Sequence, residues 1–138
     1  MGFEIVRSAI ESRLDTNWGS TTDIAWENVR FEATQDEYWI RPTILEGEAE
    51  QITLESTPLY RTIGLLTIGV FAPEGEGTAQ ARTHADSLAA IFRGAKFSGL
   101  TFWTPTITRA GTGVTQTGAN NGWFQLNVDT PFYYDEFI

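Results

Sequence analysis

The single histidine of the chain is the first residue to test for catalysis, because a hydrolytic triad needs a base beside its nucleophile. This residue, His84, lies inside a segment whose apolar spacing predicts a helix. Thr83 and Asp86 cannot face it on the same side of a helix at spacings of one and two residues. The chain has no cysteine that could serve as a nucleophile. We therefore expect no catalytic site, and we expect His84 to be a surface or interface residue.

Gly75-Glu76-Gly77 follows a predicted strand and opens a predicted helix, which is the setting of a dinucleotide-binding turn. The third glycine of that fingerprint is absent, since Gln80 stands in its place. The carboxylates of Glu74 and Glu76 would also repel a pyrophosphate. We interpret the segment as a turn before a helix and expect no bound cofactor.

Glu46, Glu48 and Glu50 alternate along the chain and could share one face of an extended segment. Three carboxylates could hold a hard cation such as Ca²⁺, but the Asp- and Asn-rich loop of a calcium site is absent. Paired carboxylates at a set separation can also hydrolyse glycosidic bonds. With 18 acidic residues some pair will always have a suitable separation, so such a pair gives no indication of this activity. The preferred interpretation is an acidic arm that faces solvent or a partner, with no metal bound.

Five tryptophans in a short chain could form a stacking platform for carbohydrate. They are Trp18, Trp26, Trp39, Trp103 and Trp123, and neither a repeat nor a regular spacing among them indicates a flat platform. Aromatic residues are also enriched in protein–protein interfaces. Core or interface positions are therefore preferred, and a small carbohydrate-binding module stays as the alternative from a different class of function.

The acidic composition restricts the partners of the chain. Its formal net charge is −9, with Lys96 as the single lysine, whereas nucleic-acid binding needs a basic patch. An acidic wall would instead let DNA slide past without binding. The 138 residues, 41% of them hydrophobic, predict one globular domain over residues 1–138. No apolar run is long enough to cross a bilayer and no secretory signal is expected at the N-terminus, so we expect no membrane partner.

Apolar periodicity predicts the elements that position these residues. Helices are expected at Phe3–Thr16 and Thr78–Arg93. Strands are expected at Ile24–Trp26, Val29–Phe31, Tyr38–Leu45, Tyr60–Phe71, Leu100–Ile107 and Trp123–Asp129, the last with an extension towards Tyr133. Pro42 cannot donate to a ladder, which places its strand at an edge or interrupts it there. Apolar groups on both faces of Tyr60–Phe71 indicate a central strand.

The order of helix, strands, helix and strands predicts an α+β fold, with a mixed, mainly antiparallel sheet and two helices packed on one face. A long hairpin arm or loop is expected at about residues 46–58 and a long loop at about residues 110–122, and loops of this length in a compact domain are usually functional or flexible. Their polar residues are our candidate assembly contacts: Glu46, Glu48, Glu50 and Gln51 in the first loop, and Thr112, Thr115, Gln116 and Asn120 in the second.

Several stretches of packing and turn positions together form a recognisable pattern. They are the amphipathic segment Phe3–Leu14, Tyr38-Trp39-Ile40-Arg41, the run Gly64–Phe71 followed by Pro73–Gly77, Ala85–Leu88 with Ile91-Phe92, and Gly122–Val128 leading into Pro131–Asp135. In this pattern the chain resembles the tail terminator-like proteins of long-tailed, siphovirus-type bacteriophages over nearly its whole length.

The resemblance implies a non-enzymatic, ring-forming subunit that caps the tail tube as a homohexamer, ends tube polymerisation and provides the surface for head–tail joining. The implied partners are further copies of the chain, the major tail tube protein and the head–tail connector or neck protein, with the tape measure protein as a further candidate. DNA would pass through the lumen without specific binding. The implied location is the head-proximal end of the virion tail, after assembly in the host cytoplasm. Another neck or minor tail role stays open as an alternative.

Overall fold

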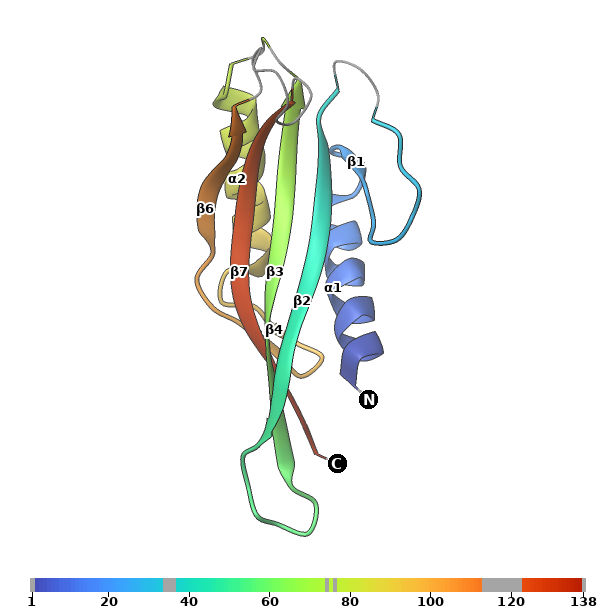
Figure 1. Cartoon of the computed structure of the whole chain (residues 1–138), viewed down its shortest axis with the longest axis vertical. Coiled ribbons are helices and arrows are strands. Elements are labelled where there is room, and N and C mark those ends of the chain that lie inside the picture. The colour runs from blue at the N-terminus through green and yellow to red at the C-terminus, as the bar shows by residue number, and fades with distance from the viewer. Residues whose placement is uncertain (1, 34–36, 74, 76, 113–122, 138) are drawn as a thin grey trace.

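The computed structural model describes residues 2–33, 37–73, 75, 77–112 and 123–137. Within these ranges the elements follow the order α1 (Gly2–Trp18), β1 (Asp23–Ile24), β2 (Trp39–Gln51), β3 (Leu59–Pro73), α2 (Ala79–Phe92), β4 (Lys96–Phe97), β5 (Leu100–Phe102), β6 (Thr106–Thr112) and β7 (Trp123–Phe137). Both helices pack on the same face of a long, curved sheet (Figure 1). The predicted α+β class and its helix placement are confirmed.

Three long antiparallel strands form the body of the sheet. The strand order is β1-β2-β3-β7-β5-β4, with β6 also paired to β7. β3 pairs with β7 along its entire length, from Leu59 opposite Phe137 to Pro73 opposite Trp123. The β1–β2 pair is parallel and the other pairs are antiparallel, so the sheet is mixed and mainly antiparallel, as the sequence predicts.

The main core lies between the helices and one face of the sheet. In α1 the apolar stripe formed by Val6, Ile10, Leu14 and Trp18 is buried, at the three- and four-residue spacing that predicted the helix. Even-numbered residues of β3 and β7, such as Leu66 and Leu126, meet it from the sheet. The opposite face, which carries the odd-numbered residues of these strands, is covered by neither helix. We call it the open face.

The positions of β2 and β3 in the sheet agree with two predictions, a central strand at Tyr60–Phe71 and an edge at Pro42. β3 lies between β2 and β7, and buries Val70 on the helix side and Phe71 on the open side, so the prediction of a central strand is confirmed. On the outer edge of β2 the Ile44 N–H donates to Glu27 Oε2 at 3.0 Å. Pro42 is two residues away, so its nitrogen points to the same outer edge, where no ladder donor is needed. The edge position of Pro42 is confirmed.

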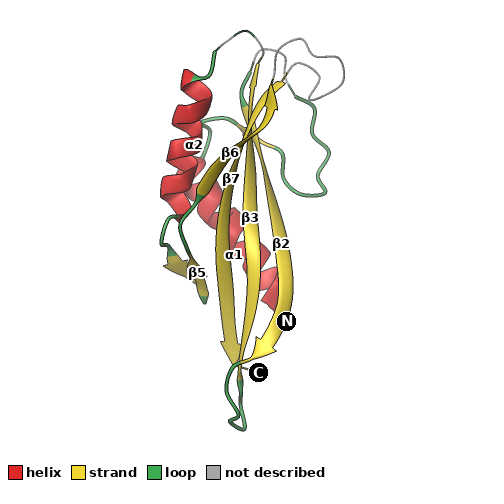
Figure 2. Cartoon of the chain, turned by 60° about the vertical axis from the view of Figure 1, so that its left-hand side comes forward, coloured by secondary structure: helices red, strands yellow, loops and turns green. Residues whose placement is uncertain are grey.

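Two strand predictions are wrong. Val29–Phe31 forms no strand, and Leu100–Ile107 is divided into β5 and β6, which pair with different parts of β7 (Figure 2). The division has a local cause in β7. The Trp103 N–H donates to the Pro131 carbonyl at 2.9 Å, so the nitrogen of Pro131 faces the same edge and has no hydrogen to donate. Pro105 also lacks a donor, and the ladder is interrupted between the two short strands.

Candidate assembly surfaces

His84 is buried, so its predicted surface position is wrong. Its side chain is 9% exposed, and its ring packs edge-to-face against Trp18 and Tyr38, with centroid distances of 5.3 Å to each. The Gln80 Nε2 atom lies 3.2 Å from the His84 Nε2 atom. His84 lies three residues after Ala81 and four before Leu88 on the buried stripe of α2, so the helical spacing was a signal of burial that the sequence analysis did not use. The rings that cover it come from the end of α1 and from the residue just before β2. His84 is therefore part of the packing that holds α1, α2 and β2 together.

This burial predicts a pH dependence of stability. Desolvation lowers the pKa of His84 below its ordinary value of 6.5. The unfolded chain then binds a proton near pH 6.5 that the folded chain does not, so this contribution is complete above about pH 6.5 and is lost as the pH falls towards the folded pKa. We expect the urea midpoint of the wild type to fall more than that of His84→Gln between about pH 7.5 and 5.5. Parallel profiles for the two proteins would contradict this.

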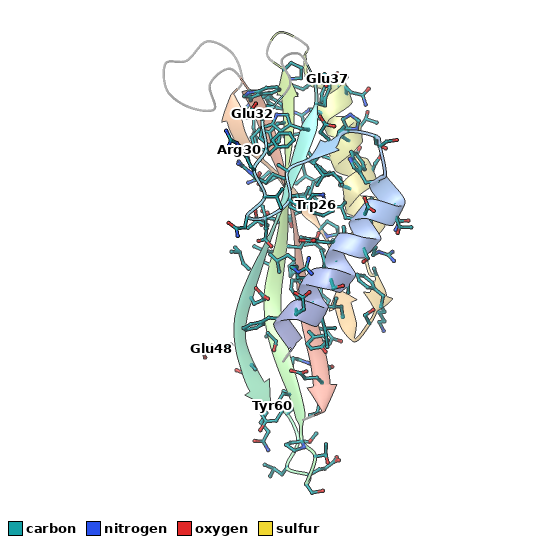
Figure 3. All side chains as sticks on the ribbon, turned by 90° about the vertical axis from the view of Figure 1, so that its right-hand side faces the viewer. Trp26, Arg30, Glu32, Glu37, Glu48 and Tyr60 are labelled. Atoms are coloured by element: carbon teal, nitrogen blue, oxygen red, sulfur yellow. The ribbon has the colours of Figure 1, made fainter. Side chains whose placement is uncertain are left out.

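The three alternating glutamates do not share one face, contrary to the sequence-based prediction. Glu46 lies opposite Gly64 and Glu50 opposite Arg61, and because these partners alternate in β3, the two carboxylates face opposite sides of the sheet. A register shift between Glu46 and Ala49 causes this reversal. Figure 3 shows Glu48 at the outer edge of β2, away from α1. Among the described residues, no group of three or more His, Cys, Asp or Glu could hold a metal ion.

Of the two forms predicted for segment 46–58, a long hairpin arm or a loop, the structure has the hairpin arm. Residues 46–51 continue β2, and 52–58 connect it to β3. Gly47 permits the irregular pairing, because a Cβ there would lie 2.7 Å from the carbonyl oxygen of Ile63. The whole segment 46–58 forms, with the start of β3, a hairpin that projects beyond α1 at one end of the molecule (Figure 1). We call residues 46–58 the hairpin arm.

Glu46 faces the helix layer near Glu27, and this placement gives a second prediction. Burial, followed by the charge of Glu27, raises the pKa of Glu46 above 4.5. A raised folded pKa disfavours the ionised form, so the contribution of Glu46 to stability is least unfavourable below about pH 4.5 and becomes more unfavourable as the pH rises from there towards the folded pKa. We expect Glu46→Gln to raise the melting temperature slightly at pH 7 and to leave it unchanged near pH 4. The control is Glu48→Gln, and an equal gain from both substitutions would refute the assignment.

Two of the remaining candidate contacts lie within the described residues. Gln51 ends β2, and its Nε2 donates to the Thr53 carbonyl at 2.8 Å. Thr112 ends β6, and its backbone lies opposite Phe124. Thr115, Gln116 and Asn120 lie outside the described residues, as does most of the predicted loop at 110–122. The assembly role of all these residues stays a prediction.

A band of apolar side chains crosses the open face, and the sequence analysis did not identify it. It consists of Leu45, Ile63, Leu65, Trp103, Pro131 and Tyr133. Leu45, Ile63 and Trp103 are 55%, 46% and 47% exposed. Leu45 lies opposite Leu65, and Leu65 lies opposite Pro131 on its other side. Trp103 packs on Tyr133 with a centroid distance of 5.3 Å. The apolar residues on both faces of β3 indicated part of this band, but the strand pairing was needed to bring the six residues together.

A cross-strand ion pair borders this apolar band. Arg61 Nε donates to Asp135 Oδ1 at 2.8 Å, and Arg61 Nη2 donates to Asp135 Oδ2 at 3.0 Å. The guanidinium carbon also lies 4.1 Å from the centroid of the Tyr133 ring. The hydrogen bond to Asp135 raises the pKa of Arg61, so the positive charge is held in place beside the apolar surface. The two residues are 74 positions apart, and sequence spacing gave no indication of the pair.

An aromatic cluster occupies the part of the open face that the apolar band leaves free. Trp39 stacks on Phe71 with ring centroids 3.9 Å apart, and Trp123 meets Trp39 edge-on at 5.9 Å. Segment 25–33 wraps the edge of β2, so that Trp26 packs against the main core and Phe31 against this cluster. The arrangement does not form a carbohydrate platform: Trp18 and Trp39 are buried, Trp26 and Trp123 are partly buried, and Trp103 is the exposed member of the five.

A pocket of about 650 Å³ lies between segment 25–33 and β2. Its walls include Val29, Phe31, Trp39 and Arg41. The guanidinium carbon of Arg41 lies 4.9 Å from the centroid of the Phe71 ring. Among the described residues Arg41 forms no ion pair, so the pocket combines apolar walls with a cation that lacks a carboxylate partner. We call it the edge pocket.

Comparisons with known proteins identify the family. One solved protein structure is similar over 100% of this chain and 98% of its own length, with a TM-score of 0.67 and 20% sequence identity, which supports the fold. No curated protein sequence matches the chain significantly. No helix in the described part of the chain is long and apolar enough to cross a membrane. The model of the phage tail terminator protein family matches residues 5–132. The chain belongs to the phage tail terminator family, and it is a structural protein of the bacteriophage tail.

Proposed function

We propose that the protein caps the tail tube as a hexameric ring, which ends tube polymerisation and provides the surface for head–tail joining. The observation that carries this proposal is the family match over residues 5–132, because it includes both helices and nearly all of the sheet. The match therefore concerns the whole arrangement of elements, rather than a short motif.

The surface of the subunit is physically consistent with assembly. The apolar band on the open face is covered by neither helix, and contiguous exposed apolar surface commonly marks a protein–protein contact. A ring built from heterologous contacts ends its own growth when its symmetry closes. A closed ring at the end of a tube would then leave no site for another tube subunit.

The proposed partners follow from this position. One side of the ring would meet the major tail tube protein, and the other would meet the head–tail connector or neck protein. The tape measure protein is a further candidate. The net charge of −9 favours a lumen that DNA crosses without specific binding. Assembly would take place in the host cytoplasm, before the tail joins the head.

The test combines mass and shape with tube binding. Purified protein is measured by light scattering over a concentration series and imaged in negative stain, alone and after addition of tail tubes assembled from the tube protein. Six copies of the 15.4 kDa chain give about 92 kDa. We expect rings with a central hole, or capped tube ends that no longer elongate. Protein that stays monomeric and leaves tube elongation unchanged would refute the proposal. Binding to isolated connectors without any effect on tubes would favour the alternative neck role.

A further inference from the structure

The tip of the hairpin arm presents a large apolar side chain to solvent. Leu54 is 96% exposed and Ile52 is 47% exposed. Single exposed apolar residues are common on protein surfaces, so exposure alone indicates little. The backbone at the base of the tip, however, is hydrogen-bonded on both sides of Leu54.

Hydrogen bonds on both sides of Leu54 order the tip. The Ile52 N–H donates to the Leu59 carbonyl at 2.7 Å, and the Leu59 N–H donates to Thr53 Oγ1 at 2.9 Å. Gln51 Nε2 donates to the Thr53 carbonyl at 2.8 Å. These bonds order the residues that flank the tip, and a segment ordered before contact loses less conformational entropy on binding.

The edge pocket is complementary to this tip in shape and charge. Its volume of about 650 Å³ is ample for a leucine side chain, and Val29, Phe31 and Trp39 supply apolar walls. The hairpin arm contains four glutamates and no lysine or arginine, and Glu55 directly follows Leu54. Arg41 stands at the pocket without a carboxylate partner among the described residues. Glu27 also lines the pocket, but its carboxylate accepts the Ile44 N–H.

The tip and the edge pocket of one chain lie too far apart to meet. The tip is at one end of the long axis, whereas segment 25–33 lies beside the other half of β2 (Figure 1). A contact between them must therefore join two copies, and because it joins two different surfaces it is heterologous, as a ring requires.

We propose that the hairpin tip of one subunit docks into the edge pocket of the next, with Leu54 among the apolar walls and Glu55 paired to Arg41. This inference rests on the proposed ring function and identifies one of its subunit contacts. Because Leu54 is almost fully exposed in the single chain, its substitution removes no intramolecular packing, and an effect on assembly reports the contact between copies.

Mutual charge reversal tests the proposed pair. Sedimentation velocity is measured on the full-length protein, alone and bound to tail tubes. We expect Leu54→Ser, Arg41→Glu and Glu55→Arg each to raise the concentration needed for assembly by about tenfold or more, as loss of a central contact does. The combined variant R41E/E55R should recover most of this loss. Absence of recovery in the combined variant would argue against the pairing of Glu55 with Arg41.

The absence of native cysteines allows a second, geometric test. Leu54→Cys combined with Val29→Cys should give disulfide-linked multimers under mild oxidation, whereas Leu54→Cys with Thr83→Cys on the exposed face of α2 should not. Rings that form normally with Leu54→Ser, and that give no Leu54–Val29 crosslink, would overturn the docking and leave the proposed function standing. A protein that stays monomeric even beside tail tubes would overturn both.

Discussion

Replacement of Phe132 with alanine is expected to lower the free energy of unfolding by about 3–5 kcal/mol, the range for a large aromatic side chain removed from a core. Phe132 is fully buried in β7, and its ring lies 5.2 Å from that of Phe102. It also fills the space above Gly64, its cross-strand neighbour in β3. The cavity would open where β3, β7 and β5 meet. These strands could not move into it without breaking the hydrogen bonds that pair them.

The neighbouring residue in β7 provides the control. Tyr133 lies on the open face, partly exposed, against Trp103 and Arg61. Tyr133→Ala should therefore cost about 1 kcal/mol, the value of its aromatic and cation contacts. Urea denaturation of both variants measures the difference. Similar losses for the two variants would mean that the helix side of β7 does not carry the main core.

Replacement of Gly64 with alanine is expected to cost about 2–3 kcal/mol, because the added methyl group has no room. A Cβ at this position would lie 2.5 Å from Phe132 Cζ and 2.8 Å from the carbonyl oxygen of Leu45. The ring could shift, but the carbonyl belongs to the β2 backbone, which is paired with β3. The strands would therefore have to separate near the base of the hairpin arm.

Gly69, in the same strand, is a matched control. A Cβ there would meet the side chain of Phe71 at 3.0 Å and the amide of Gln125 at 3.1 Å, which are longer contacts than those at Gly64 and involve no backbone atom. Gly69→Ala should cost less than about 1 kcal/mol, since alanine also reduces the entropy of the unfolded chain. Chemical denaturation compares the two, and an equal cost would show that the backbone contact at Gly64 is not the cause.

The losses of stability expected for Phe132→Ala and Gly64→Ala both bear on function, because both residues lie in the β3–β7 pair. β3 carries the hairpin arm at one end and the aromatic cluster beside the edge pocket at the other. The full-length ladder between β3 and β7 holds these two surfaces at a fixed separation. If the tip docks in a neighbour's pocket, this separation sets the geometry between adjacent subunits. Loosening of the ladder at Gly64 or Phe132 should then impair ring formation even where the fold survives.

The sequence alone determined the elements whose signals are local. The stripe from Val6 to Leu14 specified α1, because a helix brings residues three and four apart to the same face. Apolar groups on both sides of Tyr60–Phe71 indicated a central strand, and Pro42 indicated an edge. The family resemblance also came from the sequence, since it depends on packing and turn positions along the chain. The family comparison confirms it over residues 5–132.

Tertiary structure decided the features that depend on which segments meet. The rings that cover His84 belong to Trp18 at the end of α1 and to Tyr38 just before β2, and the packing of these segments brings them onto α2. The opposite orientation of Glu46 and Glu50 follows from a register shift against β3. Division of the Leu100–Ile107 segment depends both on Pro105, a local signal within the segment, and on Pro131 in β7, which only the strand pairing places beside it. The apolar band and the edge pocket likewise join residues from separate strands, so the candidate surfaces could not be assembled from spacing. Local propensity acts within a few residues, whereas pairing register and packing are set by contacts between distant segments. Those long-range contacts place the surfaces through which this subunit is proposed to assemble.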